Sequence, residues 1–227
     1  MSNRIAPKLL AEFIGTFAFV FIGAGTAAIV GEGVGLPGIV AIAFAHGLAI
    51  MAFAFAYGSV SGGHMNPAVT VGVLAAGALL LRTVLGGAET GLGMPALAHN
   101  LALGAHSLTV TPEAGFMIEA LLGFFLVTVV LGTAVAGRAG SLAPLAIGMT
   151  LTFNILMGGA LTGAPFNPAR ALGPMVATGN FSDAWLYLTA PIVGAIVAAL
   201  LHTGLVRLAG ERTTAAERGR AAQTPAE

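Results

Sequence analysis

The chain has 227 residues, of which 57% are hydrophobic and 8% are charged, with a formal net charge of zero. A soluble domain has about 25% charged residues, so this chain could not cover a water-facing surface and is expected to be an integral membrane protein. Its neutrality argues against nucleic-acid binding through a basic field, and the lack of cysteine excludes disulfides, thiol catalysis and cysteine-bound metal.

Five apolar runs approach the roughly 20 residues that a membrane-crossing helix needs. They are Leu9–Val30, Gly38–Tyr57, Gly115–Ala136, Leu142–Ala160 and Ala184–Leu208. The first run is too long for the core of a cleaved signal peptide, and it contains Glu12. Residues 211–227 are mostly small or charged, which predicts a disordered tail.

Lysine and arginine residues predict the orientation in the membrane. Of the nine lysine and arginine residues, two lie before the first run, four lie at or beyond the end of the last run, and one, Arg138, lies in a short turn. Because basic residues favour the cytoplasmic side, both termini are expected in the cytoplasm. An even number of crossings is then required, so a sixth crossing is expected between Asn66 and Gly115.

The two halves of the chain resemble each other. "AEFIGTFAFVF" (11–21) parallels "IEALLGFFLVT" (118–128), which aligns Glu12 with Glu119 at a separation of 107 residues. This predicts one membrane domain, residues 1–210, built from inverted repeats at about 8–90 and 114–210. Such repeats place a site near the membrane midplane, formed by broken helices.

An asparagine–proline–alanine triplet occurs once in each half. The triplets are Asn66, Pro67 and Ala68, and Asn167, Pro168 and Ala169. Asparagine is a favoured helix cap and proline fits the first helical turn. The glycine-rich segments before them are tolerated at membrane depth only inside protein or beside a cavity. Each triplet is therefore expected to begin a short half-helix at the membrane centre, with its positive dipole end at one shared spot.

These motifs resemble the aquaporin, or major intrinsic protein, family. The resemblance rests on "AEFIGTF", "SGGHMNPAVT", "LAPLAIGMTLTFNILMGGALTGAPFNPARALGP" and "AWLYLTAPIVGA". It implies an all-α fold with about six transmembrane helices and two re-entrant half-helices. It also implies a homotetramer in the lipid bilayer, and a passive channel for water that excludes protons and ions.

The resemblance also implies roles for individual residues. Backbone carbonyls would line the pore at Gly62, Gly63, His64 and Met65, and at Gly163, Ala164, Pro165 and Phe166. An outer constriction, the selectivity filter, would be framed by His46, Ile155, Ala164 and Arg170. This set is similar to that of plant tonoplast intrinsic proteins, and its apolar members leave room for ammonia, urea or hydrogen peroxide. Ala171, where glycerol facilitators usually have aspartate, disfavours glycerol.

Some of these residues keep alternative interpretations. Glu12 and Glu119 could carry protons in a transporter, whereas the family resemblance implies that each accepts N–H bonds from a re-entrant loop. His46 could be a plain helix–helix contact. His64 could lie near the inner pore mouth or satisfy loop carbonyls.

The interval after the first triplet is short. Residues 68–87 provide only about one span of apolar sequence, and residues 88–114 would make a poor membrane helix. The third span is therefore expected to be truncated, which keeps open the alternative of a non-conducting relative. A second alternative is an ion-coupled transporter built on the inverted repeat, which would need a titrating acid in the solute path. No catalytic residues, metal ligands or cofactor are predicted, and the plasma membrane is the expected location.

Overall fold

The computed structural model of the chain describes residues 5–30, 35–61, 83–84, 88–103, 106–137 and 139–221. Its long helices are α1 (Ile5–Val30), α2 (Gly35–Ser61), α4 (Pro112–Val130), α5 (Ala143–Thr162), α6 (Pro168–Thr178) and α7 (Ala184–Ala221). The short elements are η1 (Ala88–Gly93), η2 (Leu131–Val135), η3 (Gly140–Leu142) and strands β1 (Leu101–Leu103) and β2 (His106–Leu108).

Five of the six described α-helices belong to segments long and apolar enough to cross a membrane. These segments are Ala6–Val30, Gly35–Ser61, Pro112–Val135, Gly140–Thr162 and Ala184–Val206. They coincide with the five apolar runs, so the prediction of an all-helical, multi-span membrane protein is confirmed.

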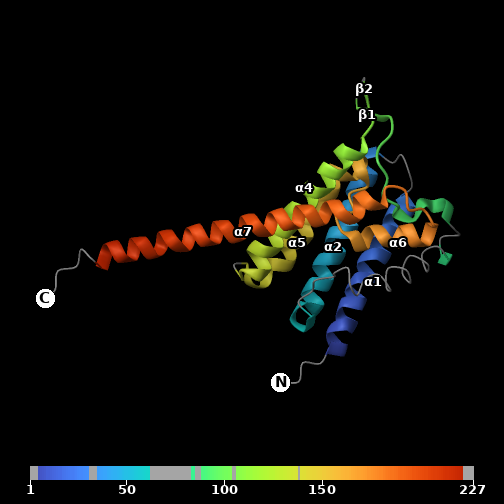
Figure 1. Cartoon of the computed structure of the whole chain (residues 1–227). Coiled ribbons are helices and arrows are strands. Elements are labelled where there is room, and N and C mark those ends of the chain that lie inside the picture. The colour runs from blue at the N-terminus through green and yellow to red at the C-terminus, as the bar shows by residue number, and fades with distance from the viewer. Residues whose placement is uncertain are drawn as a thin grey trace.

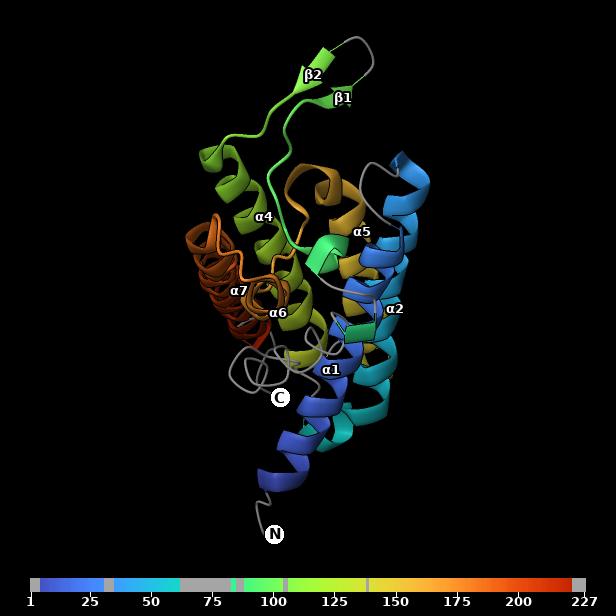
Figure 2. The same cartoon turned by 90° about the vertical axis from the view of Figure 1, so that its right-hand side faces the viewer.

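The long helices pack as two groups with α6 between them. Figure 2 shows α4 and α7 on one side of α6, and α1, α2 and α5 on the other. The α4–α7 pair crosses closely, because a β-carbon at Gly194 would overlap the carbonyl oxygen of Ala120. The α2–α5 pair does the same at Gly47 and Gly148, whose backbones face each other. Small residues at these crossings let the helix backbones approach, as is usual in membranes.

Helix α6 is the short helix expected from the second triplet. With 11 residues and about 1.5 Å of rise per residue, it covers about half of a hydrocarbon core that is roughly 30 Å thick. It follows α5 after a short loop, residues 163–167, and ends at Gly179, whose φ of 72° is left-handed. The second half of the chain therefore contains a half-length helix at the predicted position.

The segment before α4 is not a membrane helix, as its composition predicts. It forms η1, an extended stretch and the antiparallel β1–β2 hairpin, in which Leu101 pairs with Leu108 and Leu103 with His106. Figure 1 shows this hairpin projecting beyond the α4 end of the bundle. The predicted sixth crossing and first half-helix fall largely on residues 62–82 and 85–87, outside the described residues.

The segment from residue 211, for which the sequence predicts a disordered tail, is helical up to Ala221 in the structure. Helix α7 continues without a break to Ala221, and Figure 1 shows it extending past the other helices. Alanine, arginine and glutamate, which are abundant in residues 211–221, are strong helix formers. Extending an existing helix also avoids the cost of nucleating a new one. Residues 222–227 lie outside the described part of the chain.

Candidate functional site

Asn167 caps the half-helix α6. Its backbone is extended, with φ −146° and ψ 112°, and its side-chain oxygen accepts a 3.0 Å hydrogen bond from the backbone N–H of Ala169. Pro168 occupies the first helical position, where the missing N–H costs no helical hydrogen bond. The cap engages the amide oxygen, so the NH₂ group of Asn167 is the donor that this side chain can offer to a solute.

The loop before Asn167 is held in an uncommon conformation. Gly163, Ala164 and Phe166 have φ values of 77°, 42° and 30°, a region that non-glycine residues rarely occupy. Both oxygens of the fully buried Glu119 side chain hold this loop. One accepts from the backbone N–H of Phe166 at 2.7 Å, and the other accepts from the Thr162 hydroxyl at 2.6 Å.

Two further side chains extend this support and were missed by sequence reasoning. The Thr162 hydroxyl also accepts from the backbone N–H of Ala164 at 3.1 Å, and the hydroxyl of Tyr187 donates to the Thr162 carbonyl at 3.0 Å. Glu119, Thr162 and Tyr187 come from α4, α5 and α7. The loop is therefore fixed by three helices together.

Arg170 lies in the first turn of α6 and is 5% exposed. Its Nη1 donates to the carbonyl of Gly93 at 3.1 Å. Gly93 has φ 69°, and a β-carbon there would crowd Ala24 and Ala27 of α1. A glycine is therefore suited to bring this carbonyl between α1 and Arg170. The sequence did not indicate Gly93, because its role is played by the backbone carbonyl, which every residue type has.

His46 is buried in α2 beside α1. Its Nδ1 is 2.9 Å from the Ile42 carbonyl, its ring packs against Gly23, and Phe19 meets it edge-on at 5.4 Å between ring centres. Since a carbonyl can only accept, Nδ1 carries a proton. Nε2 has no hydrogen-bond partner among the described residues. Arg170 is near enough to interact with His46 electrostatically.

A cavity of about 750 Å³ lies between α1, α2, α5, the segment 91–102 and the start of α6. Its wall includes Ile42, Gly93, Ile155, Gly163 and Arg170. The structure thus brings two of the four predicted filter residues, Ile155 and Arg170, to one cavity. His46 and Ala164 are both buried and are not among the described residues that line it.

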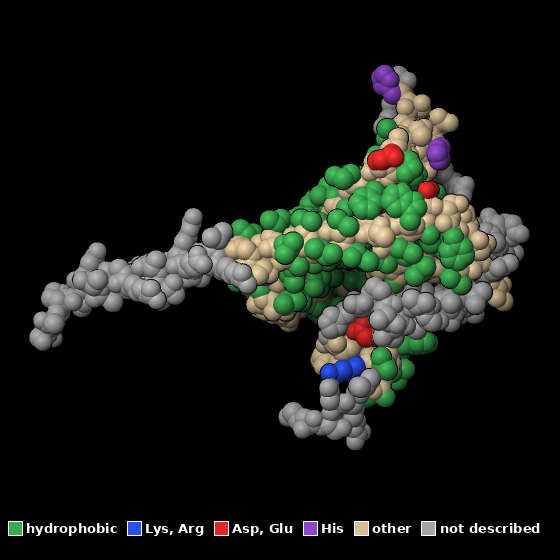
Figure 3. Space-filling view, in the orientation of Figure 1, with side chains coloured by type: hydrophobic (Ala, Val, Ile, Leu, Met, Phe, Trp, Pro, Cys, Tyr) green, Lys and Arg blue, Asp and Glu red, His purple; other side chains and the backbone are tan. Residues whose placement is uncertain are grey.

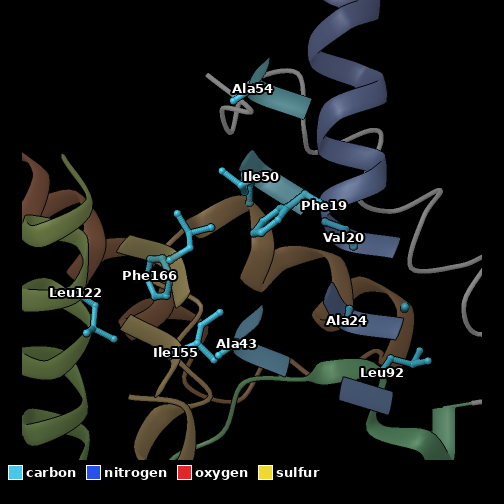
Figure 4. Packing of buried hydrophobic residues seen from close by; sticks show 14 residues of the cluster. Phe19, Val20, Ala24, Ala43, Ile50, Ala54, Leu92, Leu122, Ile155 and Phe166 are labelled. Carbon is cyan, nitrogen blue, oxygen red and sulfur yellow. The ribbon is translucent and has the colours of Figure 1, made fainter. Parts of the chain in front are cut away.

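A buried apolar cluster adjoins the loop and the start of α6. Figure 4 shows Phe19, Ile50, Ile155 and Phe166, contributed by α1, α2, α5 and the loop, grouped in this region. Ala164 and Ala169 belong to the same cluster. The residues around the Asn167 cap are therefore mostly apolar, and the polar groups there are few and fixed.

The first triplet and its loop cannot be placed in this arrangement. Gly62, Gly63, His64 and Met65, and then Asn66, Pro67 and Ala68, lie outside the described residues. Glu12, the counterpart of Glu119, is buried on α1 with 8% of its surface exposed. The roles predicted for these residues stay predictions.

Comparisons with known proteins give a consistent result. The sequence model described as major intrinsic protein matches residues 2–202. The chain is 37% identical over 210 residues to "Probable aquaporin TIP2-1" of Oryza sativa subsp. japonica, with 85% of each chain covered. It is 38% identical over 220 residues to "Aquaporin TIP4-4" of Zea mays, with 89% of this chain and 87% of the relative covered.

A solved structure shares the fold. The X-ray structure of the aquaglyceroporin from Plasmodium falciparum superposes with a TM-score of 0.68 at 21% sequence identity. The match covers 87% of this chain and 95% of the other.

Proposed function

Because the chain belongs to the major intrinsic protein family, which consists of channels and not enzymes, we propose that it conducts water passively and excludes protons and ions. A multi-pass membrane protein of the aquaporin type has to provide a path along which its solute crosses the lipid bilayer. The observation that carries the proposal is the Asn167-capped half-helix, with Arg170 on the wall of a cavity at its start.

The proposed conduction site uses fixed dipoles and a few hydrogen-bond donors. The α6 N-terminus carries a partial positive charge, and the Asn167 NH₂ group can donate to the oxygen of a passing water. We propose that Asn66 supplies the same donor from the other half. A water held by both would be oriented so that it cannot relay a proton. A cation would meet two positive helix ends and lose its hydration, which costs at least several kcal/mol.

We propose that His46, Ile155, Ala164 and Arg170 form the selectivity filter. The apolar side chains of Ile155 and Ala164 favour small neutral solutes besides water, namely ammonia, urea and hydrogen peroxide. The cluster of Phe19, Ile50 and Phe166 beside the loop offers such solutes few hydrogen bonds. The Gly163–Phe166 carbonyls are proposed to supply the remaining acceptors along the path.

Assembly and location are separate proposals. We propose a homotetramer with one pore per subunit, as the family resemblance implies. We also propose that both termini lie in the cytoplasm, which the distribution of basic residues favours. The sequence alone favours the plasma membrane, whereas the similarity to plant TIP aquaporins favours the tonoplast. The position of a fluorescent fusion in the native cell distinguishes the two membranes.

The hydrogen bonds of Glu119 bear on the alternative of a proton-coupled transporter. A proton carrier needs a titrating group in the solute path. Both Glu119 oxygens instead accept hydrogen bonds from the loop and from Thr162. This supports a structural role and therefore a passive channel.

Stopped-flow shrinkage of vesicles containing the purified chain tests the proposal. We expect water flux far above that of empty vesicles, with no dissipation of an imposed proton gradient. Shrinkage at the rate of empty vesicles would instead identify a non-conducting relative. Solute accumulation driven by a proton gradient would identify a transporter.

A further inference from the structure

A stacked aromatic pair lies at the hairpin end of the α4–α7 pair. The rings of Phe116 and Trp185 are 5.9 Å apart between centres, with an angle of 18° between their planes. Phe116 lies near the start of α4, which begins at Pro112, and Trp185 lies near the start of α7, which begins at Ala184. Trp185, the chain's single tryptophan, is 55% exposed. The conducting site described above makes no use of this pair.

The exposed surface changes from polar to apolar at the level of this pair. On the hairpin side lie exposed polar residues, including Thr111, Glu113 and Ser182. Farther along α7, the exposed residues between positions 192 and 201 are all apolar, including Ile192, Ile196 and Leu200. Figure 3 shows a broad hydrophobic surface in the region of α4 and α7, with acidic side chains toward its hairpin end. The pair therefore marks a polar-to-apolar boundary.

The length of the apolar stretch matches a bilayer. Arg207 is the first lysine or arginine after Trp185, and 22 residues of helix rise about 33 Å. The hydrocarbon core of a membrane is roughly 30 Å thick. With Trp185 at one boundary, Arg207 therefore falls at the other, and Ile196 falls near the centre.

The neighbours of the pair fix Trp185 in place. Leu186 and Tyr187, the next two residues of α7, are fully buried and pack in one cluster with Leu97 and Val110. The helix is thus held rigidly while the indole faces outward. An indole ring combines an apolar body with one N–H donor, which suits a site where one end is wet and the other is apolar.

We propose that the Phe116–Trp185 pair is an interfacial anchor that binds the headgroup–acyl boundary of the leaflet on the hairpin side. It thereby sets the depth of α4 and α7 in the bilayer. The occupant of this surface is lipid, because the boundary lies one bilayer thickness from Arg207 and continues into an apolar helix face. The inference does not depend on conduction.

The single tryptophan makes a direct test possible. Purified protein in vesicles with bromine near the carbonyl end of the acyl chain is compared with protein in vesicles brominated near the chain terminus. We expect the fluorescence of Trp185 to be quenched more by the shallow bromine. The matched control is Trp185→Phe/Ile196→Trp, which moves the indole 11 residues along the same exposed face, about 16 Å deeper. This control should be quenched more by the deep bromine.

Two results would overturn the proposal. Equal or stronger quenching of Trp185 by the deep bromine would place the pair inside the hydrocarbon. Quenching of the Ile196→Trp control but not of Trp185 would mean that water or a second copy of the chain covers the pair. Aqueous acrylamide then tells these two apart, because it reaches only a water-exposed indole. Since the native protein carries the probe, the main measurement does not depend on a variant folding.

Discussion

Replacing Glu119 with alanine is expected to destabilise the protein strongly and to abolish water conduction. The change removes the acceptors of the Phe166 N–H and the Thr162 hydroxyl, both of which are buried. A buried donor without a partner costs about 1–3 kcal/mol. The Phe166 N–H would be left in that state, whereas the Thr162 hydroxyl would keep only its longer hydrogen bond to the Gly158 carbonyl at 3.4 Å. The loop would then lose its contact at the left-handed Phe166 and keep only the hydrogen bonds that the Thr162 hydroxyl and Tyr187 make. Thermal unfolding in detergent and vesicle shrinkage measure the two effects.

Two matched variants separate this role from a general effect of charge. Glu113→Ala removes an exposed acid from the first turn of the same helix and should change stability far less than Glu119→Ala does, because water screens its interaction with the helix dipole. Glu119→Gln keeps one acceptor oxygen and should fall between wild type and Glu119→Ala. If Glu119→Ala melts at the same temperature as Glu113→Ala and still conducts, the proposed support of the loop is wrong.

Replacing Arg170 with valine is expected to weaken cation exclusion and to admit larger neutral solutes. The guanidinium is buried on the cavity wall and bonded to the Gly93 carbonyl, so its loss removes a fixed positive charge and opens space. Each ~1.4 kcal/mol taken from a permeation barrier raises flux about tenfold. Proton and urea fluxes into vesicles, normalised to water flux, measure the change.

Arg170→Lys serves as the control for charge, because it keeps the cation but loses the flat guanidinium. It should retain cation exclusion better than Arg170→Val while still altering solute selectivity. Normal thermal stability of both variants shows that the fold is intact. Unchanged proton and urea fluxes in a stable Arg170→Val variant would remove Arg170 from the filter.

The membrane-length helices could be predicted because hydrophobic length alone specifies them. The Asn167 cap with Pro168 at the first helical position followed in the same way from local backbone chemistry. The hydrogen bonds of Glu119 to the loop agree with the role implied by the family resemblance. In each case the local requirement, such as an apolar span or a helix cap, admits only a few residue types, so the sequence reveals it.

Other features depended on tertiary contacts that no local pattern encodes. The partner of Arg170 is the backbone carbonyl of Gly93, 77 residues away, and any residue type has such a carbonyl. His46 is buried beside α1 and does not line the cavity, and Tyr187 bonds to the Thr162 carbonyl at the start of the loop. Both positions depend on how α1, α2 and α7 pack. The extension of α7 through residues 211–221 depends on helix propensity, which the charged and small residues there share with disordered segments.

We propose that two asparagine-capped half-helices, one from each half of the chain, meet tip to tip within the membrane. The chain has no cysteine, so an Asn66→Cys/Asn167→Cys variant carries only the two thiols of interest. Treated in vesicles with a short thiol-to-thiol linker, this variant should form an intramolecular cross-link, detected by mass. An Asn66→Cys/Glu113→Cys pair should not form one. A 66–167 pair that reacts only singly at each thiol, with no cross-link, would contradict the claim.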